Sequence, residues 1–514
     1  MITIKMMLQN KENFIYCLAW SFLLLFFVSP DSYTHDLFFR WDSAVFFSSG
    51  KAWMEGLRPY VDFADSKGPV LWFIYGIGYL ISNYDYIGVF WLSVLSYAVV
   101  FYFDFLIALF FLKDKKLAWL VVLLLPLVYF NPWYHFEVRA EDWCFPVLKA
   151  TLYSICLMLY GNERDKRKNA NVAAFMIGLC IMWTFLIKYS ITVMVTISFG
   201  GILLHYLIRE KISCVSPSFY FILGCFILGA PFYFYMLYTD IFDSFVKEYL
   251  LNTMATVQSA NSAGKYLREW LGTLNDAYYA VLFFIGMLGS LVIVSRMDKY
   301  RYALVFTFVV FYGISIHHAI HLYYLSINLF LLVFAVIFLV GKMQSFFLQH
   351  IRRVSLVGSL SVFLLVVITN FTFTEGFFVP CLFFKDGQRR KDYYEIAYYL
   401  AQLPKPTIVY YNLTDRGYGV PAGALPGSVY WTSQTGATPD MIRVQYEDVV
   451  SMKSDFVLAH HTAQNDSLFA KLGYIRQCNT AGLTLYSKHS LTPMPSSFSV
   501  SNMDVLFKRR IFPL

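Results

Sequence analysis

Long hydrophobic segments alternate with short polar ones along most of the chain. The first segment, Phe14 to Pro30, is long enough for one membrane crossing at about 1.5 Å per residue. Ten similar segments follow, near residues 86–112, 117–133, 142–160, 170–187, 190–207, 217–239, 279–295, 302–316, 322–340 and 354–370. The pattern predicts an all-α polytopic membrane protein with about eleven transmembrane helices.

One apolar segment, Val70 to Ser82, is too short to cross a membrane. Its length of about 13 residues suits an interfacial helix. If it does not cross, the basic clusters at Lys115, Lys166 and Lys299 all fall on one side, which the positive-inside bias makes the cytoplasmic side. We therefore expect a multi-pass protein whose N-terminus, the start of a retained signal anchor, is cytoplasmic.

Beyond residue 371 the hydrophobic segments end, and short helix and strand patterns alternate. We expect helices at 392–403, 440–452 and 466–472, and strands at 407–411, 456–459 and 483–487. This alternation predicts a small α/β domain over residues 371–514, outside the cytoplasm, after a transmembrane domain over residues 1–370. The α/β domain lacks a glycine-rich phosphate loop of the usual spacing, which favours an accessory or acceptor-facing role.

Composition supports the membrane class. The 514 residues are 58% hydrophobic and only 14% charged, against about 25% charged in an average soluble domain. The net charge of +8 could suit nucleic acid, but the basic residues form short clusters between hydrophobic segments and no nucleic-acid motif is present. Most cysteines lie in or beside apolar segments, while Cys381 and Cys478 share the polar C-terminal region, where they could pair.

The densest charge in the transmembrane domain lies just after the first predicted helix, over residues 31–69. This stretch interleaves five aspartates and several cations with aromatic residues. Such interleaving is expected of helices in the membrane interface, although a solvated loop of mixed charge is the alternative interpretation. We treat it as the first outer loop and as the expected place of the chemistry.

Several motifs resemble those of the GT-C glycosyltransferases, over roughly residues 10–340. WDSAVFFSSGKAWMEG has Asp42 at the position of an acidic family motif, and RPYVDFADSKGPVLW is similar to a family segment that ends in K-P-P-L. EVRAED adds acids in a second outer loop, and HLYYLSINL resembles a His-Tyr segment that opens a late helix. Two positions depart from the pattern: Ser43 stands where many relatives have Glu, and Gly68 replaces the first Pro.

The resemblance, to bacterial relatives of protein O-mannosyltransferases and lipid A aminoarabinose transferases, implies a transferase. Its donor would be a polyprenyl-phosphate sugar, its acceptor a hydroxyl of a cell-envelope glycan, lipid or protein, and its place the outer face of the inner membrane. Transfer of the hexosyl or pentosyl group would be inverting. Two other classes remain open: a polysaccharide polymerase or ligase, and a non-enzymatic transporter of lipid-linked glycans, which would place charges along several spans.

Transfer from a sugar phosphate needs a carboxylate that activates the acceptor hydroxyl and cations that stabilise the departing phosphate. Asp42, at the matched position, is the candidate base. Lys67 is the first candidate for phosphate binding, because the glycine and proline after it can hold it clear of the following helix. Arg58 and Lys188 are further candidates.

A second acidic point, Glu141 and Asp142, lies at the outer end of a predicted helix. Three roles remain open: binding a divalent cation, orienting the acceptor, or simply a favourable placement at a helix N-terminus. Lys149, seven residues after Asp142, shares about the same helix face and is a further cation that could meet phosphate.

The motif HLYYLSINL contributes two expected site-wall residues, His321 and Tyr324. Asp104 lies inside an apolar segment and has no obvious partner in the sequence.

Overall fold

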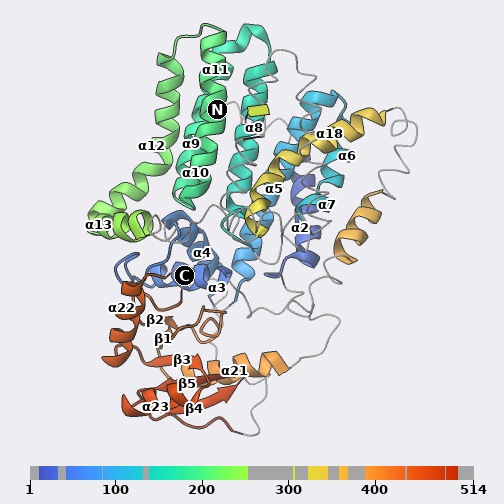
Figure 1. Cartoon of the computed structure of the whole chain (residues 1–514). Helices are drawn as coiled ribbons and strands as arrows, with labels where there is room; N and C mark the ends of the chain where they lie inside the picture. The colour runs from blue at the N-terminus through green and yellow to red at the C-terminus, as the bar shows by residue number, and fades with distance from the viewer. Residues whose placement is uncertain are drawn as a thin grey trace.

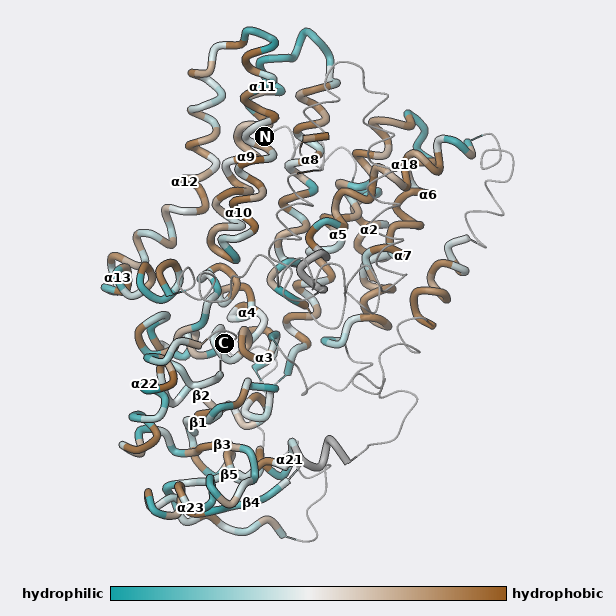
Figure 2. Tube along the Cα trace, viewed as in Figure 1, coloured by the Kyte–Doolittle hydropathy of each residue, from teal (hydrophilic) through white to brown (hydrophobic). Residues whose placement is uncertain are grey.

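The computed structural model shows a bundle of helices with a small α/β unit, residues 388–495, at one end (Figure 1). The bundle is mostly hydrophobic, while the α/β unit mixes hydrophilic and hydrophobic segments (Figure 2). The structure describes residues 11–32, 42–83, 85–130, 138–252, 305–306, 309, 322–344, 358–368, 388–433, 437–480 and 482–495.

Five helices within these ranges are long and apolar enough to cross a membrane. They are α2 (Lys11–Val28), α5 (Ile87–Leu112), η1 with α8 (Asp142–Cys144, Phe145–Tyr160), α10 with η3 and α11 (Tyr189–Val195, Thr196–Gly200, Gly201–Arg209) and α12 (Val215–Tyr238). A further helix, α9 (Lys166–Phe185), packs against α8 and α12. The predicted helical membrane class is confirmed, but the count of eleven remains a prediction because the predicted spans 279–295 and 302–316 lie almost entirely outside the described residues.

Two predicted spans differ from simple α-helices. The predicted 117–133 helix is shorter, since α6 (Lys115–Leu124) gives way to the four-residue α7 (Pro126–Tyr129), whose proline has no N–H to continue the ladder. In the predicted 322–340 helix, the first part is the 3₁₀ helix η5 (Leu322–Leu332), followed by α18 (Val333–Lys342). A 3₁₀ run of this length is uncommon and indicates a local constraint.

Two short helices, α3 (Asp42–Met54) and α4 (Pro69–Ile81), lie between the bundle and the α/β unit (Figure 1). The 13 residues of α4 agree with the predicted short segment. Gly50 lets the two helices approach closely, because a Cβ there would lie 2.5 Å from the backbone nitrogen of Gly76. Helices α3 and α4 therefore pack together and connect the bundle to the α/β unit.

The α/β unit contains one five-stranded sheet of order β2-β1-β3-β5-β4. Its elements are α21 (Gln388–Leu400), β1 (Thr407–Tyr410), β2 (Leu425–Pro426), α22 (Pro439–Val450), β3 (Phe456–His460), α23 (Ala463–Lys471), β4 (Ile475–Thr480) and β5 (Leu483–Ser487). Strands β2, β1 and β3 are parallel, and β5 is antiparallel to β3 and β4. The three predicted helices and three predicted strands are present, whereas β2 and β4 were not expected. The predicted boundary at residue 371 lies outside the described residues.

Candidate active site

Asp42 is the first residue of α3 and is half-buried. The next residue, Ser43, donates from Oγ to the carbonyl oxygen of Val138 at 2.7 Å, and the Tyr75 hydroxyl donates to the same oxygen at 2.6 Å. These bonds hold the start of α3 against the segment that leads to Glu141. The serine that stands where many relatives have Glu therefore has a structural function here.

The loop that contains Lys67 pairs with the turn that contains Lys188. The backbone N–H of Gly68 donates to Ile187 O at 3.0 Å, and that of Val70 donates to Leu186 O at 2.9 Å. A proline at position 68 could not donate this bond, and any Cβ there would overlap Leu186 O. The departure from the K-P-P pattern thus permits a backbone contact between the loop that contains Lys67 and the turn that contains Lys188.

Lys67 also contacts the first turn of α3. Its ammonium lies 5.8 Å from the centre of the Phe46 ring, and Phe46 is one helical turn after Asp42. The Tyr60 hydroxyl donates to Lys67 O at 2.9 Å and so anchors the loop from within. The predicted base and the predicted phosphate ligand are therefore on adjoining segments.

Arg58, by contrast, is paired within its own loop. Its Nη2 lies 3.3 Å from Oδ1 of Asp62, and its backbone N–H donates to Asp62 Oδ2 at 2.7 Å. The guanidinium side chain is 53% exposed, which makes this a surface ion pair of small energetic value. Both contacts are to Asp62, and neither links Arg58 to Lys67 or Lys188.

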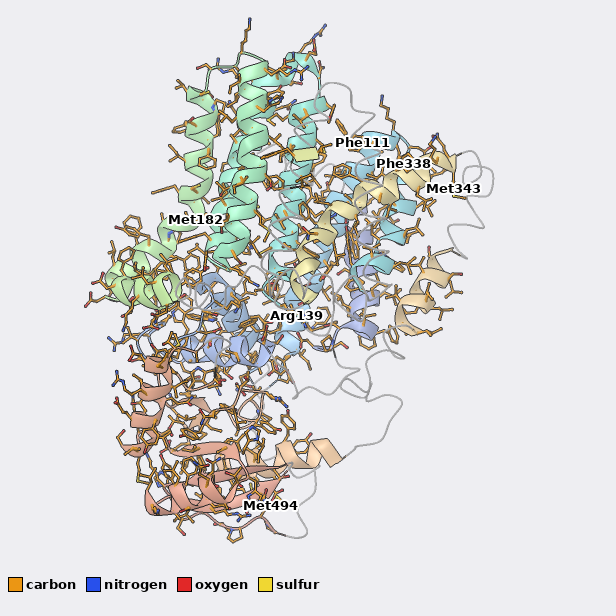
Figure 3. All side chains as sticks on the ribbon, viewed as in Figure 1. Phe111, Arg139, Met182, Phe338, Met343 and Met494 are labelled. Atoms are coloured by element: carbon orange, nitrogen blue, oxygen red, sulfur yellow. The ribbon has the colours of Figure 1, made fainter. Side chains whose placement is uncertain are left out.

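Lys188 forms an ion pair with Glu141 at 2.6 Å. Glu141 is buried, and although burial alone would raise its pKa, Lys188 and the nearby Arg139 hold the pKa of this carboxyl below its usual range. Arg139, labelled in Figure 3, is itself buried at the end of the bundle that faces the α/β unit. The sequence analysis does not predict a role for Arg139, although a cation beside the two acids of EVRAED indicates a possible ion pair.

Asp142 has different partners from its neighbour Glu141. Its carboxylate accepts from the Tyr97 hydroxyl at 2.8 Å and from the backbone N–H of Arg139 at 2.9 Å. Within the described ranges, no group of three His, Cys, Asp or Glu residues could hold a metal ion. The two acids thus contact separate partners, and a divalent cation at this point stays a prediction.

Lys149, predicted from its place on about the same helix face as Asp142 to be a cation that could meet phosphate, is instead paired inside the bundle. It donates to Asp104 Oδ1 at 2.5 Å, to the Tyr129 hydroxyl at 2.6 Å and to Phe330 O at 2.7 Å. The three N–H donors of the ammonium are thus all used inside the bundle. The structure corrects the proposal that Lys149 meets phosphate, and it supplies the partner of Asp104.

Three sequence candidates have little structural description. His321 and Cys381 lie outside the described residues. Tyr324 is part of η5, but its side chain is not among those that the structure describes. Cys478 is a buried free thiol of β4.

A second polar junction, missed from the sequence, joins α3 to the α/β unit. The Ser48 hydroxyl donates to Asp415 Oδ2 at 2.8 Å, and the Lys51 ammonium donates to Ala424 O at 3.1 Å. Lys51 is 3% exposed and Asp415 is fully buried. Burial lowers the pKa of Lys51 to about 7, against the opposing effect of the Glu55 and Asp415 charges, and burial raises the pKa of Asp415.

This junction predicts a pH-dependent stability. Between the folded pKa of Lys51, about 7, and its ordinary 10.5, the unfolded chain binds the proton more tightly than the folded chain. The free energy of unfolding should therefore rise with pH in this window, by at most about 1.4 kcal/mol per pH unit for one proton, and the cost of burial is fully present below pH 7.

The measurement is the unfolding free energy of wild type and Lys51→Met in detergent between pH 7 and 10. The unfolding free energy of wild type should rise relative to that of Lys51→Met as the pH rises. Lys405→Met serves as control, because Lys405 contacts Glu55 across the same junction but is 72% exposed. A wild type to Lys51→Met difference that stays constant over this range contradicts the prediction.

The chain was compared with known proteins. No family model matches it, and none of the curated proteins is similar to it. ArnT from Cupriavidus metallidurans bound to undecaprenyl phosphate aligns over 94% of this chain and 99% of its own, at 11% identity and a TM-score of 0.43. The Archaeoglobus fulgidus oligosaccharyltransferase with zinc and sulfate aligns over 93% and 73%, at 12% identity and 0.43, and its apo form over 95% and 75%, at 10% and 0.47. The alignments with these solved structures thus cover more than nine tenths of the chain, at low sequence identity.

Proposed function

We propose that this protein is a membrane glycosyltransferase that transfers a sugar from a polyprenyl-phosphate donor to a hydroxyl acceptor. One observation carries the proposal: Asp42, Lys67 and the Lys188–Glu141 pair lie on segments that contact one another at the end of the bundle facing the α/β unit. A carboxylate and two cations, here on adjoining segments, are the groups that this chemistry needs.

In the proposed reaction, Asp42 accepts the proton of the acceptor hydroxyl, and the oxygen of that hydroxyl attacks the anomeric carbon of the sugar. The bond between that carbon and the phosphate oxygen breaks, and its electron pair remains on the polyprenyl phosphate. Lys67 and Lys188 stabilise the added negative charge. We assign Lys67 the larger share of phosphate binding because it occupies the matched position in DSKGPVL and lies beside α3. Attack opposite the leaving phosphate would invert the anomeric centre.

We propose further that the bundle, within residues 1–370, holds the polyprenyl chain and that residues 371–514 form an acceptor-facing domain outside the cytoplasm. In this arrangement the N-terminus is cytoplasmic and the protein lies in an inner membrane. The hydrogen bonds of α3 with Asp415 and Ala424 hold the α/β unit beside the site, which supports an acceptor-facing role for it.

The function is tested by supplying membranes with radiolabelled polyprenyl-phosphate sugars, with mannose, glucose and aminoarabinose as the panel. Membranes from cells with the protein should transfer label to an endogenous acceptor, and membranes from cells without it should not. A parallel sample with a chelator measures any requirement for a divalent cation. Equal transfer by both kinds of membrane with every donor would reject the proposal.

We expect Lys67→Ala to raise the donor KM and slow turnover while insertion and thermal stability stay close to wild type. The reason is that a half-buried lysine over an aromatic ring contributes little to the fold, whereas loss of a phosphate-bound charge removes a charge-assisted bond. Lys67→Arg should retain part of the activity because it keeps the charge. The measurement is donor saturation of the purified, lipid-reconstituted protein.

The matched control is Lys405→Ala, which removes a lysine of the α/β unit near α3 without changing the site. It should leave donor saturation unchanged. If Lys67→Ala saturates and turns over like wild type, Lys67 does not bind the phosphate.

A further inference from the structure

Four segments around the proposed donor site form a closed ring of hydrogen bonds. The loop of residues 60–70 bonds to the turn of residues 185–189 through Gly68 and Val70. That turn bonds to the π-helix η4 (Val246–Leu251), because Tyr249 Oη accepts from Tyr189 N at 2.9 Å and donates to Phe185 O at 2.6 Å.

The α/β unit closes the ring. The Tyr430 hydroxyl donates to Oε2 of Glu248 in η4 at 2.8 Å. The adjacent residue, Val429, accepts from the Ala64 N–H at 2.9 Å, three residues before Lys67. Ala64 and Tyr430 also pack with Met441 of α22 in one small apolar cluster. One segment of the unit thus holds both η4 and the loop of Lys67.

The Glu248–Tyr430 bond is buried, as both residues are less than a tenth exposed. Burial and the neighbouring carboxylate raise the pKa of the Tyr430 phenol, so it stays protonated and donates. Asn252 Nδ2 also donates to Glu248 Oε2 at 2.9 Å, and Gln445 holds Tyr430 O at 2.6 Å. In the π-helical turn η4, the adjacent residues Glu248 and Tyr249 contact different segments.

We infer that Tyr430 and Glu248 are positioning residues that hold the loop of Lys67 and the turn of Lys188 in register for the donor phosphate. The inference rests on the proposed function for the identity of the ligand. The α/β unit thereby has a second task besides facing the acceptor: it completes the frame around the two lysines. Neither residue is expected to contact the reacting atoms.

The test compares Tyr430→Phe with wild type, both full-length and in nanodiscs. Loss of the hydroxyl should increase hydrogen exchange at the amides of Ala64 and Tyr189, at opposite ends of the ring. With the polyprenyl-phosphate sugar that wild type uses, the donor KM should rise about tenfold, the scale of one hydrogen bond to a charged group, while kcat changes less.

Tyr474→Phe is the matched control. It also removes one buried tyrosine hydroxyl of the α/β unit, bonded to Val449 O at 3.1 Å, but this hydroxyl takes part in none of the ring's hydrogen bonds described above. Glu248→Gln keeps an acceptor for the Tyr430 hydroxyl, so this variant should retain nearly wild-type hydrogen exchange and donor KM. Glu248→Ala should match Tyr430→Phe, and the double variant should add little to either, since both remove one interaction.

Unchanged exchange at Ala64 and Tyr189 in Tyr430→Phe overturns the inference, whatever the enzyme's activity. Faster exchange with an unchanged donor KM in an active enzyme also overturns it, because the ring then has no effect on donor binding. Faster exchange in a protein that transfers none of the tested sugars supports the ring as the frame of the two lysines and counts against the proposed function alone.

Discussion

Asp42→Asn should lower turnover by at least about a hundredfold, the scale of removing a general base. Asparagine keeps the size of aspartate and its capacity to accept hydrogen bonds at the start of α3, but it cannot take a proton from the acceptor. The bonds from Ser43 and Tyr75 to Val138 do not involve the Asp42 carboxylate, so the helix should keep its place. Turnover of the reconstituted variant with saturating donor measures the effect.

The matched control is Asp114→Asn. Asp114 caps α6 by accepting from the amides of Lys116 and Leu117, and it lies beside the predicted cytoplasmic cluster, at the other end of α5 from the site. Both variants change an aspartate at a helix start, but only Asp42→Asn should lose activity. Near-normal turnover of a stably inserted Asp42→Asn protein would mean that Asp42 serves only the helix.

The sequence predicted the local features of the fold well, because hydropathy and strand alternation are properties of adjacent residues. The 26-residue helix α5 and the 13-residue helix α4 both follow from segment length. The strand β4 was missed for a physical reason: it is an edge strand of polar sequence, IRQCNT, in which mainly Cys478 and Thr480 are buried.

Partners in the site were harder to predict than its members. Lys188 and Glu141 were both selected, but they are 47 residues apart and only the packing of α9 and α8 brings them together. Lys51 looked like one more charge of the first outer loop, and nothing near it in sequence indicates that the α/β unit would bury it. Such contacts depend on tertiary packing between distant segments.

Asp104 and Lys149 were different, because a usable rule existed. An isolated charge in an apolar span is costly unless it is paired, so two opposite lone charges in different spans, at 86–112 and 142–160, are candidate partners. Helix periodicity instead placed Lys149 on about the same face as Asp142 and did not indicate the pair with Asp104. The observed pair connects α5 to α8, and through Phe330 O it also holds the unusual 3₁₀ helix η5.

Lys149→Ala should destabilise the protein strongly, by about 3–5 kcal/mol, because it leaves the Asp104 carboxylate buried with its cation removed. Both side chains of the pair are fully buried, so water cannot replace the missing partner without opening the bundle. Among the described residues, only the Tyr129 hydroxyl would still donate to Asp104. The free energy of unfolding in detergent micelles is the measurement.

A double variant, Lys149→Met with Asp104→Leu, should recover much of this loss, since it removes both charges and keeps apolar volume. Lys166→Ala is the matched control: Lys166 pairs with Glu210 at 2.8 Å but is 33% exposed, so its loss should destabilise the protein far less than the loss of Lys149. Equal destabilisation by Lys149→Ala and Lys166→Ala would contradict the argument, because burial is what separates the two pairs. A double variant as unstable as Lys149→Ala would instead show that the bundle depends on the bond to Phe330 O, and with it on the position of η5.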